Sequence, residues 1–157
     1  MLSTLVLLLA RLGRLNDALV NQVCTDFEIS SAELRTLACL RYAEGRRGTP
    51  TELARLVVQT SGGLTATLRR LEARGAVERA ADETDGRGRP VVLTDAGAEL
   101  HDRAFEALVA RYDAIFDGVD VDGALTAVRS LIGPLELAMR AASSAAWAHP
   151  APEEVSA

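Results

Sequence analysis

One segment, residues 60–94, constrains the fold of this chain more than any other part of its sequence. It consists of TSGGLTATLRRLEARGAVERAADETDGRGRPVVLT. Leucines three and four residues apart predict an amphipathic helix that ends at a glycine, followed by short β-strands over 76–81 and 90–94. A shorter helix is expected over 49–58, before the turn Gln59-Thr60-Ser61. Two helices joined by a tight turn and followed by a basic hairpin predict a winged helix-turn-helix, which places one helix in a DNA groove.

The second helix of this motif, with Ser61 taken as its N-cap, has two chemically distinct faces. At about 100° per residue, the leucines share one arc and are expected in the core; they are Leu64, Leu68 and Leu71. The opposite arc combines small residues, which admit a helix to a groove, with groups that contact bases and phosphates. We expect DNA contacts from Ser61, Gly62, Thr65, Ala66, Arg69 and Arg70, with Ala73 on the same side. A merely solvated helix face is the alternative interpretation.

The hairpin tip, Asp85-Gly86-Arg87-Gly88-Arg89, provides a second expected DNA contact. Its glycines allow a close turn and leave Arg87 on a thin projection, which suits the narrow minor groove with its strongly negative potential. Asp85 is placed to pair with Arg87 and fix its direction, and Arg89 is expected to contact DNA as well. The alternative is a polar hairpin whose acidic residues cancel its charge.

The charge distribution agrees with a DNA-binding module attached to an acidic body. The 157-residue chain carries a net charge of −5, and all 17 of its basic residues are arginines. Residues 46–90 contain nine arginines and six acidic residues, a local net charge of +3, so the rest of the chain carries −8. A local basic excess of this kind favours contact with a polyanion.

The helices that surround this motif are expected to complete a mainly α-helical fold. A first helix over about 3–24 has leucines on more than one side, which indicates burial against a partner chain. Ser30 or Ser31 caps a helix with an apolar face formed by Leu34, Leu37, Ala38 and Leu40, and a glycine-punctuated loop follows over 44–48. Thr49-Pro50-Thr51-Glu52 forms a capping box for a helix that buries Leu53, Leu56 and Val57.

The C-terminal part is expected to contain two long helices. The first begins at Thr94-Asp95 and breaks at Asp117-Gly118, and the second spans about 121–147. The second carries a coiled-coil-like seam of Val121, Leu125, Val128, Ile132, Leu135 and Met139, with a bend expected at Gly133-Pro134. We therefore predict a dimerisation helix over 1–28, a DNA-binding lobe over 30–95, further dimerisation helices over 95–147 and a disordered tail over 148–157.

The two parts LARLVVQTSGGLTATLRRLEARGAVER and DGRGRPVVLTDAG resemble the MarR-type winged-helix transcriptional regulators over roughly residues 30–100. The resemblance implies a homodimer with interlocked first and last helices that binds pseudo-palindromic operators, commonly represses, and releases DNA when a small molecule or oxidant acts. By motif position, Ser61, Thr65, Ala66 and Arg69 would face the major groove, and Asp85 would support Arg87 in the wing. The Ser-Gly-x-Leu-Thr helix start is most similar to the peroxide-sensing branch. That branch has its reactive cysteine near the start of the first helix, where this chain has only leucine and alanine.

By analogy with the family, an effector crevice is expected between the dimerisation helices and the DNA-reading lobe. Arg11, Leu15, Tyr42 and His101 are its candidate walls, and an apolar or aromatic small molecule is the expected effector. A thiol-based redox switch is the alternative. Cys24, at the end of the first helix, is expected to be partly exposed and is the redox candidate, whereas Cys39 is expected to be buried.

Catalysis is not expected, because the chain has only two histidines and no metal-ligand cluster, phosphate-binding glycine loop or nucleophile elbow. No metal or other cofactor is therefore expected. The apolar run from Leu5 to Ala10 is too short for a membrane span and follows no basic segment, so we expect a cytoplasmic protein. A winged helix that serves only as a protein-interaction module is the remaining alternative.

Overall fold

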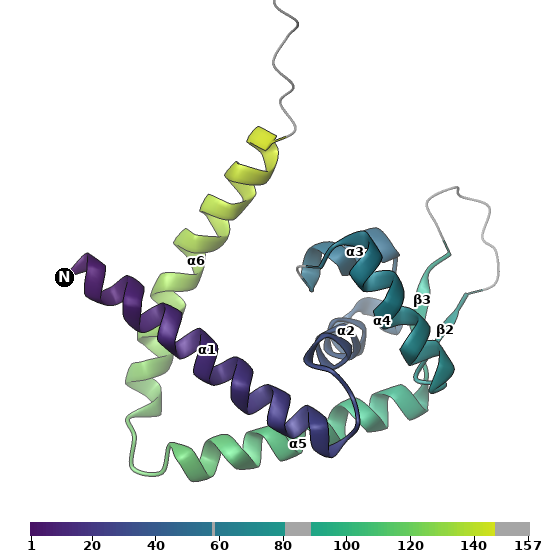
Figure 1. Cartoon of the computed structure of the whole chain (residues 1–157), viewed down its shortest axis with the longest axis horizontal. Helices are drawn as coiled ribbons and strands as arrows, with labels where there is room; N and C mark the ends of the chain where they lie inside the picture. The colour runs from purple at the N-terminus through teal and green to yellow at the C-terminus, as the bar shows by residue number, and fades with distance from the viewer. Residues whose placement is uncertain (58, 81–88, 147–157) are drawn as a thin grey trace, which may run out of the picture. The chain divides into compact units, whose positions relative to one another are not determined.

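The computed structural model describes residues 1–57, 59–80 and 89–146, and Figure 1 shows the chain. It forms two compact units, one over residues 1–113 and one from residue 114 onward. The chain is mainly helical with one small antiparallel sheet, which confirms the predicted fold class. The helices are α1 (Leu2–Asp26), α2 (Ser31–Tyr42), α3 (Pro50–Leu56), α4 (Ser61–Ala73), α5 (Asp95–Ile115) and α6 (Val121–Ala146). The strands are β1 (Arg47–Gly48), β2 (Val77–Arg79) and β3 (Val91–Leu93), and a 3-10 turn covers Glu44–Arg46.

Side-chain caps start the helices of the central motif. α2 has Ser30 as its N-cap in a reciprocal capping box with Glu33, and α3 has the predicted box between Thr49 and Glu52. α4 corrects the sequence-based prediction, because its N-cap is Thr60, whose hydroxyl accepts the Gly63 N–H at 3.2 Å. Ser61 is instead the first helical residue. Threonine and serine both cap well, so the sequence alone does not choose between adjacent candidates.

The core lies between α4, α2, α3 and the sheet. The α4 leucines fill it as predicted, together with apolar side chains of the neighbouring elements: Leu37, Leu40, Leu53, Val57, Leu64, Leu68, Leu71, Val77, Val91 and Leu93. The prediction that Leu56 is buried was wrong, since this side chain is 65% exposed. Leu53 and Val57, one helical turn apart, take the core positions of α3. Leu56 ends the helix at the edge of that apolar face.

The sheet has a third strand that the sequence did not predict. Its order is β1-β3-β2, and both pairings are antiparallel, with Arg47 opposite Val92 and Val77 opposite Leu93. A loop had been expected where β1 lies, because a two-residue strand is too short to show alternation. The hairpin extends beyond its regular strands through the Ala80 N–H, which donates to the Pro90 carbonyl at 2.9 Å.

The C-terminal end of α1 packs against α5 in the first unit. At the end of α1, Cys24 packs with Ile29, Leu34 and Ala104 in a small second core. The Arg111 guanidinium of α5 pairs with Asp26 at 3.2 Å. α5 ends before Gly118, which has a positive φ of 75°, in agreement with the expected break. None of the described helices combines the length and apolar composition that a bilayer crossing requires.

α6 belongs to the second unit and continues as one helix through Pro134. Five positions of the predicted seam are exposed in the single chain: Val121, Leu125, Val128, Ile132 and Leu135. Trp147, the predicted end of this helix, and the predicted tail over 148–157 lie outside the described residues, as do Asp85 and Arg87 of the wing.

The junction between the wing and α5 depends on one close backbone contact. A Cβ atom on Gly97 would lie 2.0 Å from the Ala76 carbonyl oxygen and 2.8 Å from the Leu93 Cδ1 atom. The Thr94 hydroxyl caps this end of α5 by accepting the Gly97 N–H at 3.0 Å, and it donates to the Gly75 carbonyl at 2.7 Å. Only glycine therefore lets the first turn of α5 pack against the start of the wing.

We predict that Gly97→Ala lowers the free energy of unfolding by roughly 1–3 kcal/mol, because the methyl group forces α5 away from the sheet. Urea unfolding followed by circular dichroism measures this change. Gly62→Ala is the matched control, since a Cβ there meets no atom within 4 Å. The control should stay within about 0.5 kcal/mol of the wild type. Equal midpoints for both variants would contradict the proposed contact.

Candidate nucleic-acid interface

α4 presents the two faces that the sequence predicted. Leu64, Leu68 and Leu71 are buried, whereas Gly62, Thr65, Ala66, Arg69 and Ala73 are exposed. The space next to Gly62 is open, so another molecule could approach the backbone there closely. The Ser61 side chain lies outside the described part of the structure. The exposed face is therefore built mainly from small residues, and Arg69 and Arg70 are the arginines exposed on α4.

Arg70, also a predicted contact, has a partner inside the protein. Its Nε donates to the Glu33 Oε1 at 3.2 Å, and its Nη2 donates to the Thr67 hydroxyl at 3.4 Å. The sequence did not reveal this pairing because Glu33 and Arg70 are far apart in the chain and meet only when α2 packs against α4. Arg69 and Arg70 are adjacent, yet they lie in different electrostatic surroundings.

Other arginines of the basic segment are similarly occupied. Arg79 of β2 pairs with Glu72 of α4 at 2.6 Å, and Arg46 pairs with Asp95 at 3.1 Å. The Arg74 guanidinium donates to the Glu28 carbonyl. Within the described ranges, Arg69 forms no ion pair. Since pairing neutralises much of the local charge, Arg69 is the cation on the outward face of α4 that is available to a polyanion.

The candidate effector residues do not form one crevice in the single chain. Tyr42 and His101 contact each other edge to face with ring centroids 5.6 Å apart, and Phe105 stacks on His101 at the same distance. Arg11 and Leu15 instead line a separate hollow on α1 itself, together with Leu8, Leu9 and Leu12.

His101 is buried and held by an ion pair between α2 and α5. Its Nδ1 lies 2.9 Å from the Asp102 carboxylate, and Arg41 donates to both Asp102 oxygens at 3.1 and 3.2 Å. Hydrogen bonds from Arg41 and then from His101 lower the pKa of Asp102 below its ordinary value. The other ring nitrogen, Nε2, is buried without a hydrogen-bond partner among the described residues.

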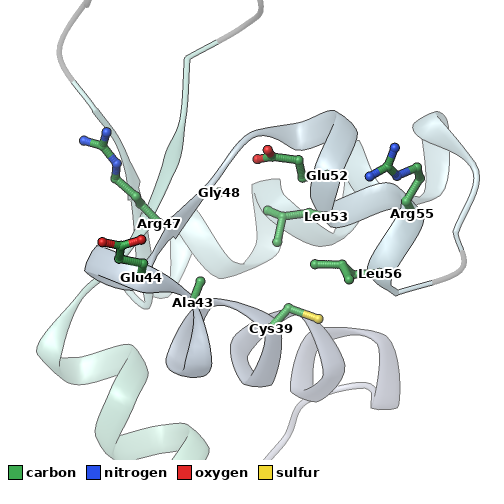
Figure 2. A pocket seen from close by; sticks show the side chains of 9 residues that line it. All are labelled: Cys39, Ala43, Glu44, Arg47, Gly48, Glu52, Leu53, Arg55 and Leu56. Atoms are coloured by element: carbon green, nitrogen blue, oxygen red, sulfur yellow. The ribbon is translucent and has the colours of Figure 1, made fainter.

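The predicted exposure of the two cysteines was wrong: Cys24, expected to be partly exposed, is buried, and Cys39, expected to be buried, is partly exposed. Cys24 is only 1% exposed, because α1 ends against α2 and α5 and encloses it. Cys39 is partly exposed and lines a groove of about 320 Å³ between α2, β1 and α3. Figure 2 shows its thiol on the α2 side of this groove, with Leu53 and Leu56 on the α3 side. Burial raises the pKa of both thiols, so neither is activated as a thiolate.

We predict that Cys39 reacts with a disulfide reagent in the native protein and that Cys24 does not, because only Cys39 reaches the surface. Reaction with 5,5′-dithiobis(2-nitrobenzoic acid), followed by absorbance, measures this difference. Cys39→Ser should abolish the native reaction, and Cys24→Ser should leave it unchanged. Rapid labelling of Cys24 in the native Cys39→Ser variant would show that the end of α1 opens.

No group of three or more histidine, cysteine or acidic side chains is placed to hold a metal ion in the described ranges. The described part of this lobe is instead a helix with an exposed face, flanked by a small antiparallel sheet. Such a lobe presents the side chains of one helix face at its surface.

Comparisons with known proteins agree with this geometry. A model of the MarR family matches residues 27–88. The chain is 30% identical over 133 residues to the HTH-type transcriptional regulator PecS of Dickeya dadantii, covering 82% of this chain and 77% of that protein. It is 36% identical over 84 residues to the multiple antibiotic resistance protein MarR of Escherichia coli, covering 54% of this chain and 57% of that protein. The alignment thus spans little more than half of that relative's length.

The crystal structure of a mutant Escherichia coli MarR complexed with operator DNA is similar to this structure. The TM-score is 0.69 at 28% sequence identity, and the match covers 84% of this chain and 93% of the other. The matches to PecS and to this structure both extend well beyond the helix-turn-helix segment. With its capped α3 and α4, its three-stranded winged sheet and its long flanking helices, this chain belongs to the MarR family of transcriptional regulators.

Proposed function

We propose that this chain is a DNA-binding transcriptional regulator and a repressor that binds a pseudo-palindromic operator as a homodimer. The observation that carries the proposal is the division of α4 into a buried leucine face and an exposed face of small residues around Arg69. A helix of this kind enters the major groove, because glycine and alanine allow close approach and arginine reaches guanine or phosphate. The match to a relative complexed with operator DNA supports the same conclusion.

Within this proposal the recognition helix and the wing have different roles. Thr65 and Arg69 read base edges, and Gly62 and Ala66 provide the space for close approach. Arg87, aimed by Asp85, and Arg89 add a minor-groove and phosphate contact that depends little on sequence. This assignment of the wing rests on the amino-acid sequence.

The dimer is proposed from the apolar surface of the two terminal helices. On α1, large apolar side chains are more than half exposed in the single chain: Leu2, Val6, Leu7, Leu8, Leu12 and Leu15. The α6 seam is exposed as well. Contiguous apolar surface of this extent indicates an interface. Two recognition helices in one dimer would lie about 34 Å apart and read half-sites about 10 base pairs apart.

We further propose that an apolar or aromatic small molecule, rather than an oxidant, releases the DNA. The aromatic cluster of Tyr42, His101 and Phe105 offers ring surface for such a ligand, because Tyr42 and Phe105 are 70% and 44% exposed. In the single chain Arg11 and Leu15 lie at a separate hollow of α1. In a dimer, the Arg11 and Leu15 side chains of the second copy would be the ones to complete this site. A redox switch has no comparable support, because Cys24 is enclosed and its pKa is raised. A regulator of chromosomal genes would act in the cytoplasm.

We predict that variants of the recognition helix and the wing fail in different ways. Thr65→Ala and Arg69→Ala should cost roughly 1–3 kcal/mol on the operator and much less on random duplex, because base contacts are lost. Arg87→Ala should weaken binding to the operator and to random duplex alike, and it should lower the slope of log affinity against log salt concentration by about one unit. Asp85→Ala should have the same effects, but smaller. Titrations over a salt series, with operator DNA selected from a random pool, measure these effects.

Arg35→Ala is the control for charge, since it removes an exposed arginine of α2 that belongs to neither the proposed DNA contacts nor the proposed dimer interface. It should leave operator affinity unchanged. If Thr65, Arg69, Asp85 and Arg87 could all be replaced without any change in affinity, the protein-interaction module would be the better interpretation. Unchanged binding by Arg87→Ala alone would remove only the wing from the mechanism.

We predict that the double substitution L8E/L12E separates the dimer into monomers, because it places two carboxylates in the proposed apolar interface. Both leucines are exposed in the single chain, so the fold of the DNA-binding lobe should persist. Sedimentation velocity at low micromolar concentration measures the oligomeric state, and operator binding should weaken in parallel. Asn21→Glu, at an exposed polar position of the same helix, is the control. A dimeric L8E/L12E variant would place the interface elsewhere.

A further inference from the structure

A chain of hydrogen bonds joins the start of α2 to the recognition helix. The Ser30 N–H and hydroxyl both donate to the Glu33 Oε2 at 2.7 Å, and the other carboxylate oxygen accepts from Arg70 at 3.2 Å. Arg70 also donates to Thr67, whose hydroxyl donates to the Gly63 carbonyl at 3.1 Å. We call the set Glu33, Arg70 and Thr67 the clamp. Arg70 provides the bond between α4 and α2, and the bonds among residues 63, 67 and 70 run within α4 along one side of the helix.

The burial of Glu33 makes its ion pair with Arg70 unfavourable to break. Its side chain is 5% exposed, whereas that of Arg70 is 53% exposed. A buried carboxylate that lost its cation would be left with an uncompensated charge, which is strongly unfavourable. Burial alone would raise the pKa of Glu33, but hydrogen bonds from Ser30 and the charge of Arg70 outweigh it and lower the pKa. Glu33 is therefore charged at neutral pH and attracts Arg70 toward α2.

We propose that Glu33 is a positioning residue for the recognition helix and that it keeps Arg70 from contacting DNA. The inference rests on the proposed operator binding. The leucine packing gives α4 its inner and outer faces, and the Glu33–Arg70 pair adds a fixed point on α2 that restricts rotation of the helix about its axis and so keeps Thr65 and Arg69 aimed outward. By occupying Arg70, it removes a cation that would bind any phosphate backbone. Both effects favour the operator over random DNA, since phosphate contacts carry no sequence information.

Glu33→Gln tests the clamp without removing the helix cap. Glutamine serves at this position of a capping box, so the amide oxygen can still accept from Ser30. The amide nitrogen then faces Arg70, and two donors cannot bond to each other. The substitution therefore releases Arg70 and leaves α2 capped. Glu106→Gln removes the same charge from an exposed position of α5 and is the matched control.

The expected result concerns both affinity and salt dependence. Glu33→Gln should steepen the salt slope on random duplex by about one unit, as Arg70 gains a phosphate. It should lower the ratio of operator to random affinity by about tenfold. Arg70→Gln should lower this ratio too, through lost positioning, but leave the random-duplex slope unchanged. Glu106→Gln should match the wild type. A slope reduced by about one unit in Arg70→Gln would show that Arg70 binds phosphate in the wild type and would overturn the proposal.

A second measurement is independent of DNA binding. In urea unfolding, Glu33→Gln and Arg70→Gln should each lower the folding equilibrium constant by about tenfold, and the double variant should lower it by little more than either. Additive effects would show that the two residues are not coupled and would overturn the clamp. Should the wild type have no operator preference, the operator proposal fails by itself, and a non-additive cycle would still support the clamp.

Discussion

The burial of one leucine stripe determines how the rest of the DNA-reading lobe is arranged. Leu64, Leu68 and Leu71 of α4 pack against α2, α3 and the sheet, and each buried leucine contributes about 1.5–3 kcal/mol. Because these side chains define the inner face of the helix, they also define its outer face. The exposure of Thr65 and Arg69 follows from the same packing. Function at the surface therefore depends on an apolar contact in the interior.

Ion pairs within the protein then decide which of the surrounding arginines remain available to contact a polyanion. Arg46, Arg70 and Arg79 are each paired with a carboxylate from another element, whereas Arg69 forms no ion pair within the described ranges. Exposed pairs of this kind contribute little to stability, but they redistribute positive charge over the surface. On α4, pairing thus distinguishes Arg69 from its neighbour Arg70. The pair between Glu33 and Arg70 differs from the others because its carboxylate is buried.

Much of the fold and part of the candidate site could be predicted because the relevant patterns are local. The capping boxes at Ser30 and Thr49, the leucine stripe of α4 and the break near Gly118 all depend on residues within a few positions of one another. The errors arose where distant elements meet. β1 exists only because β3 lies beside it, and Cys24 is buried only because α2 and α5 enclose it. The exposed Leu56 likewise borders a groove that α2 and α3 form together.

By itself, the sequence determined the order and type of the helices, the hairpin and the two faces of the recognition helix, since spacing and capping act through neighbouring residues. Tertiary structure alone decided that Arg70 turns toward Glu33 while Arg69 forms no ion pair within the described ranges. It also decided that Gly97 must be a glycine, because the Ala76 carbonyl occupies the place of a side chain. The physical reason is common to these cases: packing brings together groups that are far apart in the chain, and burial then makes their charge and volume matter.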